Sequence, residues 1–386
     1  MDKIYFDNSA TTKISKRAKD KMIEVMDSFY GNPSSLHEIG FEAEKVISSA
    51  KDIILRSLGI YSPQKKELIF TSGGTESNNL AIFGVVNSKK RQKTEKIMIT
   101  NGEHSSVENC AKQLEKEGYQ ILRVPTIRGE LDLDYIEKNS EDVILASFMH
   151  VNNETGALYD IGQAFDIIRK KSGGVVCHAD CVQSYAKVKS DIKSLGADLV
   201  SLSGHKINAA KGIGALYVSP ETIKAKKIVP IVYGGGQEFG FRSGTENVYG
   251  IASFGEAAKE HFSNIDKEIE HMREVREYLI SQLSDHVQIN NPKKSAPHIL
   301  NITINNVKSE TMLHYLESFG IYVSSGSACT SNSNDKTSKA LLAFGLNKDQ
   351  ADSSIRISLS PQNTIEEADY VSKKIIEGKG KLAKKK

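Results

Sequence analysis

A lysine that directly follows a predicted buried strand is the first residue whose type and position indicate chemical reactivity. Lys206 ends the segment Ser201-Leu202-Ser203-Gly204-His205-Lys206, which overlaps the predicted strand Leu199–Ser203. Ligands gather at the carboxyl ends of strands in α/β sheets, so we expect the amine to lie at a binding site. A lysine there can form a Schiff base with a carbonyl cofactor, most commonly pyridoxal 5′-phosphate (PLP). Alone, the segment also fits a surface lysine at the start of a loop.

An aspartate at the end of another strand has the chemistry that PLP needs. Asp180 lies in His178-Ala179-Asp180-Cys181-Val182-Gln183, after the predicted strand Gly174–His178. A carboxylate beside the pyridine nitrogen keeps that nitrogen protonated, so that the ring can accept electrons. Without Lys206, a simple turn aspartate would be an equally good interpretation.

Two more segments could hold a phosphate and carry a proton. Thr71–Ser77 reads Thr-Ser-Gly-Gly-Thr-Glu-Ser between a strand and a helix, where glycines allow close approach and free helix amides attract anions. His104 follows a strand in Gly102–Ser106, where an imidazole could cover a cofactor ring and transfer protons. The structural alternatives are a common glycine-rich turn and a histidine in a helix-capping region.

Cys329 lies in a run of small polar residues from Ser324 to Asp335. With little to pack, this run predicts a mobile, exposed loop whose thiol is reactive once its pKa is lowered. Cys177 and Cys181 could form a metal pair, but no second Cys/His pair has fitting spacing, which favours packing. We therefore expect no metal site, and four scattered cysteines fit a reducing cytoplasm.

The elements that must position these residues alternate between strands and helices, which is typical of an α/β fold with a mostly parallel sheet. The predicted strands are Glu67–Thr71, Lys96–Thr100, Gln120–Val124, Val143–Ser147, Gly174–His178, Leu199–Ser203 and Ile213–Val218. The predicted helices are His37–Leu58, Glu76–Asn87, Ser106–Glu117 and Ile161–Lys171.

The pattern changes at about Gly250, where one long amphipathic helix is predicted to run to about Leu283. The strands predicted after it are Ile299–Asn305, Ile321–Ser325 and Ser354–Ser360, with helices between them. We assign residues 15–260 to a large domain, and residues 1–14 and 261–386 to a smaller α+β domain that carries the Cys329 loop.

Composition argues against a membrane protein and against a secreted protein. The 386 residues contain no apolar run near the roughly 20 residues of a membrane span, and the N-terminus lacks the apolar stretch of a signal peptide. The net charge is +3 and is spread along the chain, so we expect no direct nucleic-acid binding and a solvated basic tail. These features predict a cytoplasmic protein.

Together the motifs resemble the cysteine desulfurases of the NifS/IscS kind, which belong to the class V PLP-dependent aminotransferase superfamily. The resemblance covers nearly the whole chain, and the segment Ser324–Thr330 is similar to the group with a long cysteine loop. The matching segments, in order, are Tyr5–Thr12, Gly31–Ser35, Thr71–Asn79, His150–Glu154, Ser203–Lys206, Arg242–Thr245, Ser324–Thr330 and Ser354–Ser358.

The resemblance implies a PLP-dependent transferase (aspartate aminotransferase-like) fold and the conversion of L-cysteine to L-alanine, with a persulfide left on Cys329. It implies that Lys206 holds PLP and moves a substrate proton, while His104 stacks on the ring and assists. The other implied contacts are Asp180 with the pyridine nitrogen, Asn153 and Gln183 with the phenolic oxygen side, Gly74, Thr75, Ser203 and His205 with the phosphate, Thr245 with the phosphate of the neighbouring subunit, and Arg356 and Asn32 with the substrate carboxylate.

The resemblance also implies a homodimer and a sulfur-acceptor protein. Departures from the usual pattern, such as Asn208-Ala209-Ala210 and Phe239, leave the acceptor open between an iron–sulfur scaffold and a tRNA-thiolation enzyme. The alternatives are another class V PLP enzyme, either an aminotransferase or a selenocysteine lyase, and a non-catalytic scaffold. An aminotransferase has no need of a thiol on a mobile loop, so Cys329 favours the desulfurase.

Overall fold

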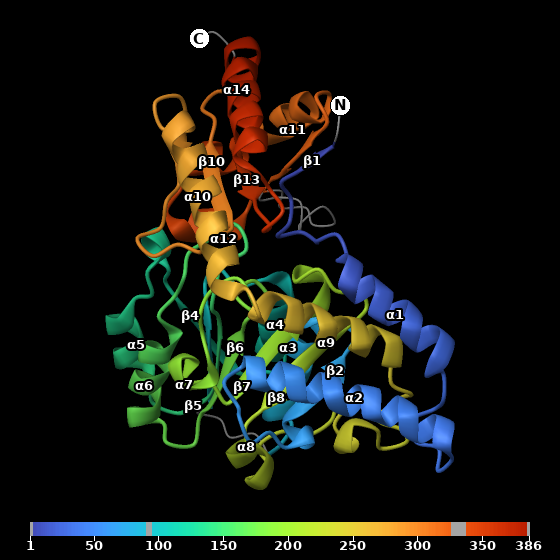
Figure 1. Ribbon diagram of the computed structural model, residues 1–386. Coiled ribbons are helices and arrows are strands. Elements are labelled where there is room, and N and C mark those ends of the chain that lie inside the picture. Colours follow the sequence, from blue (N-terminus) through green and yellow to red (C-terminus); the bar gives the residue numbers. More distant parts are fainter. Residues whose placement is uncertain (1–2, 90–94, 326–336, 384–386) are drawn as a thin grey trace.

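The computed structural model describes residues 3–89, 95–325 and 337–383. Its largest sheet has seven strands in the order β2-β8-β7-β6-β5-β3-β4, and only β8 pairs antiparallel, with β2 and β7 (Figure 1). This arrangement confirms the α/β fold with a mostly parallel sheet. The strands are β2 (Leu68–Thr71), β3 (Lys96–Thr100), β4 (Gln120–Val124), β5 (Val143–Met149), β6 (Val176–Asp180), β7 (Leu199–Ser203) and β8 (Gly214–Val218).

Helices cover both faces of this sheet, as the continuous burial of its central strands requires. Successive side chains of a strand point to opposite faces, so Ile97 and Ile99 of β3 pack under α3 (Gly74–Val86) and α4 (Ser105–Lys116). Met98 faces the other way, into the core formed with α2 (Glu38–Ser57), α6 (Ile161–Lys171) and α9 (Val248–Phe262). The remaining helices around this sheet are α1 (Lys16–Ser28), α5 (Leu133–Asn139), α7 (Ile192–Leu195) and α8 (Pro220–Lys224).

Two strands extend two residues beyond their predicted ends. β5 continues to Met149 and β6 to Asp180, and these two residues pair with each other in parallel register. Asp180 is therefore the last residue of a strand and not the first residue of a turn. A polar side chain is tolerated there because it lies at the edge where the strands end.

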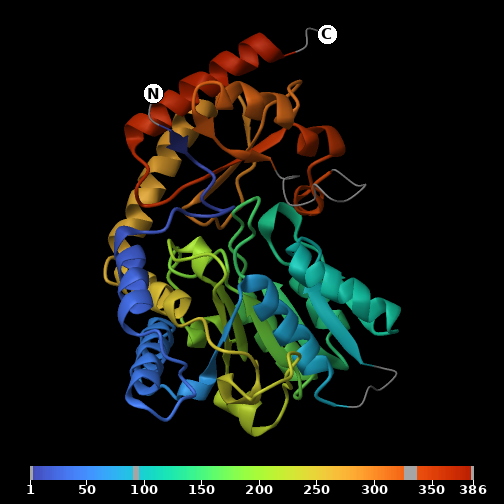
Figure 2. The same cartoon turned by 90° about the vertical axis from the view of Figure 1, so that its right-hand side faces the viewer.

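A second, four-stranded antiparallel sheet has the order β12-β13-β10-β9. Its core includes Phe6 from the N-terminal segment, whose β1 (Ile4–Tyr5) pairs with β11 (Ile321–Tyr322) (Figure 2). The other elements here are β9 (Gln288–Ile289), β10 (Ile299–Thr303), β12 (Ser324–Ser325), β13 (Ser354–Ser358), α10 (Ile265–Leu283), α11 (Ser309–Glu317), α12 (Lys339–Phe344), α13 (Lys348–Asp352) and α14 (Ile365–Leu382). The exact domain division stays a prediction.

Two sequence predictions were wrong in this part of the chain. The single helix expected up to Leu283 is interrupted at Ser263 and Asn264, giving α9 and α10. Short polar side chains compete with the helical backbone for hydrogen bonds, and the break lets α9 pack on the large sheet and α10 on the small one. The strand expected over 321–325 is likewise two short strands in different sheets.

A buried ion pair lies along the β2 edge of the large sheet. Lys51 of α2 contacts Glu238 at 2.6 Å, and both side chains are less than 5% exposed. Lys51 also donates to the Leu68 carbonyl, while Glu238 accepts from the Phe70 amide. The pair thus satisfies the outward backbone groups of the edge strand β2.

Replacing one partner of this pair should strongly destabilise the protein. Lys51→Ala leaves the Glu238 carboxylate buried without its cation, so we expect the free energy of unfolding to fall by about 3–5 kcal/mol. Urea unfolding measures it. The matched control is Lys45→Ala, since the exposed Lys45–Glu42 pair should contribute less than about 1 kcal/mol. Equal losses in the two variants would contradict the assigned role.

Candidate active site

A cavity of about 360 Å³ lies at the carboxyl ends of β3, β5, β6 and β7. Parallel pairing brings these ends to one edge of the sheet, so residues distant in sequence meet there. Of the residues predicted from the sequence, the cavity is lined by Gly74, Thr75, His104, Asn153, Asp180, Gln183, Ser203, His205, Lys206 and Arg356.

Lys206 reaches this cavity from the short turn that follows β7. Its Nζ donates to the backbone carbonyls of Ser9 (2.6 Å) and Ala10 (2.8 Å). The N-terminal segment, nearly 200 residues away in sequence, therefore holds the amine at the cavity wall. Carbonyl acceptors orient the lysine without forming an ion pair with it.

Asp180 lies at the end of β6 with both carboxylate oxygens engaged. Asn78 Nδ2 donates to Oδ2 at 2.8 Å, and the Val182 amide donates to Oδ1 at 3.0 Å. Two residues earlier on the same face of β6, His178 forms hydrogen bonds of 2.8 Å with both Ser147 and Ser201. Burial lowers the pKa of His178 to about 4, so the imidazole is neutral and serves to join three strands.

His104 both caps a helix and lines the cavity. It is the N-cap of α4, where Nδ1 accepts from the Ser106 amide at 3.2 Å, and it also lines the cavity. Burial lowers the pKa of His104, with Asp180 acting in the opposite direction. A neutral imidazole held in this way can accept a proton.

The residues around Gly74 fit a phosphate group. Gly73 cannot cap α3 with a side chain, so the first amides of this helix point outward without a side-chain cap. A Cβ on Gly74 would approach Val182 to 2.6 Å, so only glycine permits this packing. Ser203 Oγ and Gln183 Oε1 are buried without a hydrogen-bond partner among the described residues.

These features together match the chemical demands of PLP. The cavity supplies an amine, a carboxylate, a neutral imidazole and a set of amide and hydroxyl donors, which are the kinds of group that PLP needs. Burial lowers the pKa of His205 to about 4, with Lys206 next in effect, so His205 at this end contributes a neutral hydrogen-bonding group. The residues present therefore fit the group.

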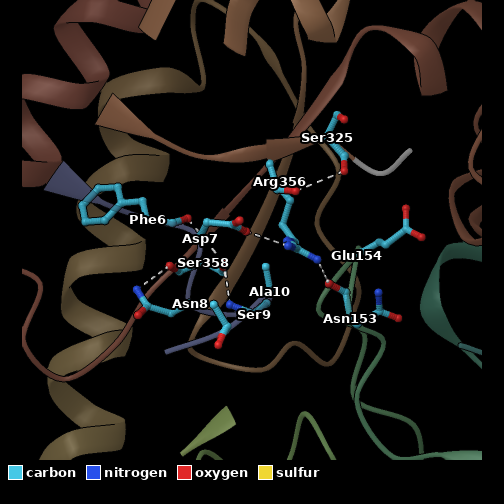
Figure 3. Close-up of polar contacts among 12 residues, drawn as sticks. Phe6, Asp7, Asn8, Ser9, Ala10, Asn153, Glu154, Ser325, Arg356 and Ser358 are labelled. Atoms are coloured by element: carbon cyan, nitrogen blue, oxygen red, sulfur yellow. Dashed lines mark hydrogen bonds and ion pairs between the residues drawn. The ribbon is translucent and has the colours of Figure 1, made fainter. Parts of the chain in front are cut away.

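Arg356 enters the cavity from β13 of the small sheet (Figure 3). Its Nη2 donates to Asp7 at 2.8 Å, and its Nη1 donates to the Asn153 carbonyl at 2.9 Å. Its Nε is buried without a partner among the described residues. A guanidinium has five N–H donors, so this one keeps capacity for a carboxylate.

Two predicted residues lie in a different pocket, and one falls outside the described residues. Asn32 and Thr245 do not line this cavity but share a separate surface pocket of about 490 Å³. Cys329 falls outside the described residues. Cys177 and Cys181 are both buried and burial raises the pKa of each thiol, as expected for packed cysteines. No cluster of three metal-binding side chains occurs in the described ranges.

Sequence reasoning missed the residues that orient the predicted ones. Asp7 holds Arg356, Asn78 holds Asp180, and Glu103 joins two strand ends. Each partner is separated from its target by between 46 and 349 residues, except that Glu103 also binds nearby Thr100. The only available signal was that Asp7 and Asn78 fall within segments quoted for the resemblance.

The carboxyl group of Glu103 makes the stability of the folded protein depend on pH. Its Oε1 accepts from Thr100 Oγ1 (2.7 Å) and from the Met149 amide (3.0 Å), while its Oε2 is buried without a partner among the described residues. Burial raises the pKa of Glu103 to about 8. The unfolded chain releases this proton near pH 4.5, so the carboxyl costs the folded state stability as the pH rises toward 8.

We expect Glu103→Gln to remove this pH dependence. The free energy of unfolding of the variant minus that of the parent should rise by about 3 kcal/mol between pH 5 and pH 8. Urea titrations at the two pH values measure the difference. Glu141→Gln, at an exposed position, is the control and should show no such change. A constant difference for Glu103→Gln would refute the assignment.

Comparisons with known proteins agree with this site. The family model for class V aminotransferases matches residues 4–371. The cysteine desulfurase IscS of Pectobacterium carotovorum subsp. carotovorum (strain PC1) is 39% identical over 387 residues, which cover 98% of this chain and 93% of that protein.

Solved structures agree as well. A NifS-like protein superposes with a TM-score of 0.89 at 34% identity, over 97% of this chain and 99% of that chain. The structure of SspA in complex with cysteine gives a TM-score of 0.80 at 29% identity, over 94% and 100%. The chain therefore belongs to the class V aminotransferase family, whose members are PLP-dependent, and within it to the cysteine desulfurases of the IscS and NifS kind.

Proposed function

We propose that this chain removes sulfur from L-cysteine, releasing L-alanine and leaving a persulfide on Cys329 for transfer to an acceptor. The observation that carries the proposal is the convergence of Lys206, Asp180, His104 and Arg356 in one cavity. Support also comes from the cysteine desulfurases that the chain resembles over nearly its whole length.

PLP, when bound, supplies an electron sink that weakens bonds to the substrate carbons. Lys206 would hold the cofactor through its amine and could take the proton from the substrate Cα. Asp180, oriented by Asn78, would keep the pyridine nitrogen protonated. His104 would cover the ring and could accept or return protons, because its imidazole is neutral.

Around the ring, the other cavity residues would take the contacts that the resemblance implies. Gln183 and Asn153 would lie on the phenolic oxygen side, where Gln183 Nε2, which donates to the Ser9 carbonyl at 2.9 Å, has a second N–H to offer. Thr75, Ser203 and His205 would bind the phosphate together with the Gly74 backbone.

Arg356 selects a substrate that carries a carboxylate. Two of its N–H groups bind Asp7 and the Asn153 carbonyl, which fix the plane of the guanidinium. The remaining donors bind the carboxylate of L-cysteine. Asn32 does not line the same cavity, so any help that it gives would come from another copy of the chain.

The sulfur-transfer step conserves atoms and electrons without an external oxidant. The Cys329 thiolate attacks the substrate sulfur, forming an S–S bond while the C–S bond breaks. The electron pair of that bond stays on carbon, which takes up a proton and becomes the methyl group of L-alanine. Carbon is reduced and the two sulfurs are oxidised to the persulfide level.

The homodimer remains part of the proposal. Thr245 and Asn32 line one surface pocket beside the exposed side chains of Tyr30 and Tyr249. Exposed aromatic side chains gathered at a pocket favour burial against another protein surface. In such a dimer Thr245 would reach the phosphate of the neighbouring subunit.

We further propose a cytoplasmic enzyme whose acceptor is an iron–sulfur scaffold or a tRNA-thiolation enzyme. Iron–sulfur assembly is supported by the similarity to IscS, whereas tRNA thiolation rests on the departures noted in the sequence. In the described part of the chain, no helix has both the length and the apolar composition needed to cross a membrane.

Replacing Arg356 should weaken substrate binding more than cofactor binding. Because lysine cannot form the planar two-donor contact, Arg356→Lys should raise the KM for L-cysteine by about 30-fold. Steady-state alanine release gives the KM, and the visible spectrum checks cofactor content. Arg17→Lys, in an exposed ion pair, is the control. An unchanged KM in a cofactor-loaded variant would contradict the role of Arg356.

The function itself is tested by intact mass. Protein free of reductant and exposed briefly to L-cysteine should gain one sulfur atom, mapped to Cys329, with alanine in solution. Cys329→Ser should keep the cofactor spectrum and lose both the added sulfur and alanine turnover. Undiminished sulfur release by Cys329→Ser, or a cofactor-loaded parent that never modifies Cys329, would refute the proposal and point to another class V reaction.

A further inference from the structure

Among the described residues that line the cavity, two side chains are carboxylates, and they differ in how fully they are engaged. Both oxygens of Asp180 accept hydrogen bonds, one from Asn78 and one from the Val182 amide. Asp7 accepts from Arg356 Nη2 through Oδ1 at 2.8 Å, and no described residue donates to its Oδ2. The Asp7 side chain is 21% exposed and lines the cavity, so a bound ligand meets its charge.

The backbone fixes the position of the Asp7 carboxylate. The Phe6 carbonyl accepts from the Ser358 amide at 2.7 Å, and the Asn8 amide donates to the Ser358 carbonyl at 3.2 Å. These bonds join the chain on both sides of Asp7 to the end of β13, the strand that carries Arg356. The carboxylate and the guanidinium therefore lie on adjacent segments, and Asp7 points toward Arg356 (Figure 3).

Few cations are available to a ligand in this cavity. Lys206 and Arg356 are the only Lys or Arg side chains among the described residues that line it. Under the proposed function, Lys206 is occupied by the cofactor. Burial lowers the pKa of His104, and it lowers the pKa of His205 to about 4, so both imidazoles are neutral at pH 7. A ligand with a second carboxylate therefore finds no further cation in the described part of the cavity.

Charge balance then distinguishes between ligands. Asp7 and Arg356 carry opposite charges, so the pair is neutral before a ligand enters. L-Cysteine with a protonated thiol has one ammonium and one carboxylate and adds no net charge. L-Aspartate adds one uncompensated negative charge near the Asp7 carboxylate, in a partly enclosed cavity where charge repulsion is stronger than in water.

A second carboxylate near Arg356 provides a comparison. Glu154 follows Asn153 in the turn after β5, but its side chain points away from the Arg356 guanidinium (Figure 3). It accepts a hydrogen bond from Ser338 at 2.5 Å and does not line the cavity. Asp7 is thus the carboxylate beside this guanidinium that a ligand in the cavity meets.

We propose that Asp7 is a specificity-determining residue that excludes amino acids with a second negative charge, such as L-aspartate, and so reserves the Arg356 site for ligands with an uncharged side chain. The inference rests on the proposed function, because it requires that the cavity bind an amino acid through Arg356. It adds a basis for substrate selection and assigns no proton transfer or bond cleavage to Asp7.

L-Aspartate and L-asparagine test this inference, since they have the same shape and differ by one charge. The Kd of each is read from the visible spectrum of the cofactor-loaded protein, and the Ki of each from competition with L-cysteine. In the parent, L-aspartate should bind about tenfold more weakly than L-asparagine. Asp7→Asn keeps an acceptor oxygen for Arg356 and removes the charge, so the ratio of the two Kd values should fall by about tenfold.

Three further variants separate charge from shape. Asp7→Ser also removes the charge and should give the same fall, so the test does not depend on whether Asp7→Asn folds. Asp7→Glu keeps the charge and should retain most of the discrimination. Glu154→Gln is the matched control, since it removes a buried carboxylate that acts on Arg356 but does not line the cavity, and it should leave the ratio unchanged.

An unchanged ratio in cofactor-loaded Asp7→Asn and Asp7→Ser would overturn the inference. So would an equal gain for both ligands, because Asp7 would then only adjust Arg356, or the same fall in Glu154→Gln, because the effect would not belong to Asp7. A parent that binds neither ligand, or binds both equally well, would also overturn it. A parent that discriminates as expected but never gains sulfur on Cys329 would support selection by charge and refute only the proposed sulfur step.

Discussion

The site depends on one constraint, which is that β3, β5, β6 and β7 run parallel as neighbours in one sheet. Their carboxyl ends must then meet at one edge, and each end contributes a different group. His104 follows β3, Asn153 follows β5, Asp180 ends β6 and Lys206 follows β7. Buried His178, bonded to serines on both neighbouring strands, keeps these ends in register.

The second sheet closes the cavity with a cation. Arg356 is held by Asp7 and by the Asn153 carbonyl, so the N-terminal segment, the large sheet and the small sheet meet at one guanidinium. Burial here lowers the pKa of His104 and raises the pKa values of Glu103 and Glu154 toward neutrality. Loss of hydration on burial thus favours the neutral form of all three groups.

Much of the fold and of the site could be predicted because the relevant signals are local. Apolar runs located the seven strands of the large sheet to within about two residues, and small polar residues after those strands indicated the cavity. The helix expected to run to Leu283 was wrong because its apolar periodicity continues through Ser263 and Asn264. Where such a helix breaks depends on which of two cores each half can bury against.

The sequence by itself determined the family and the type of cofactor and predicted the reacting groups, since these depend on residue types and on spacing within short segments. Only the tertiary structure decided which residues orient those groups. Asn78 holding Asp180, Asp7 holding Arg356 and Glu154 holding Ser338 are pairs separated by 102 to 349 residues. Such pairs form because strand order and sheet packing bring distant segments together. Contacts of this kind produce no periodic pattern in the local sequence, so they could not be predicted from it.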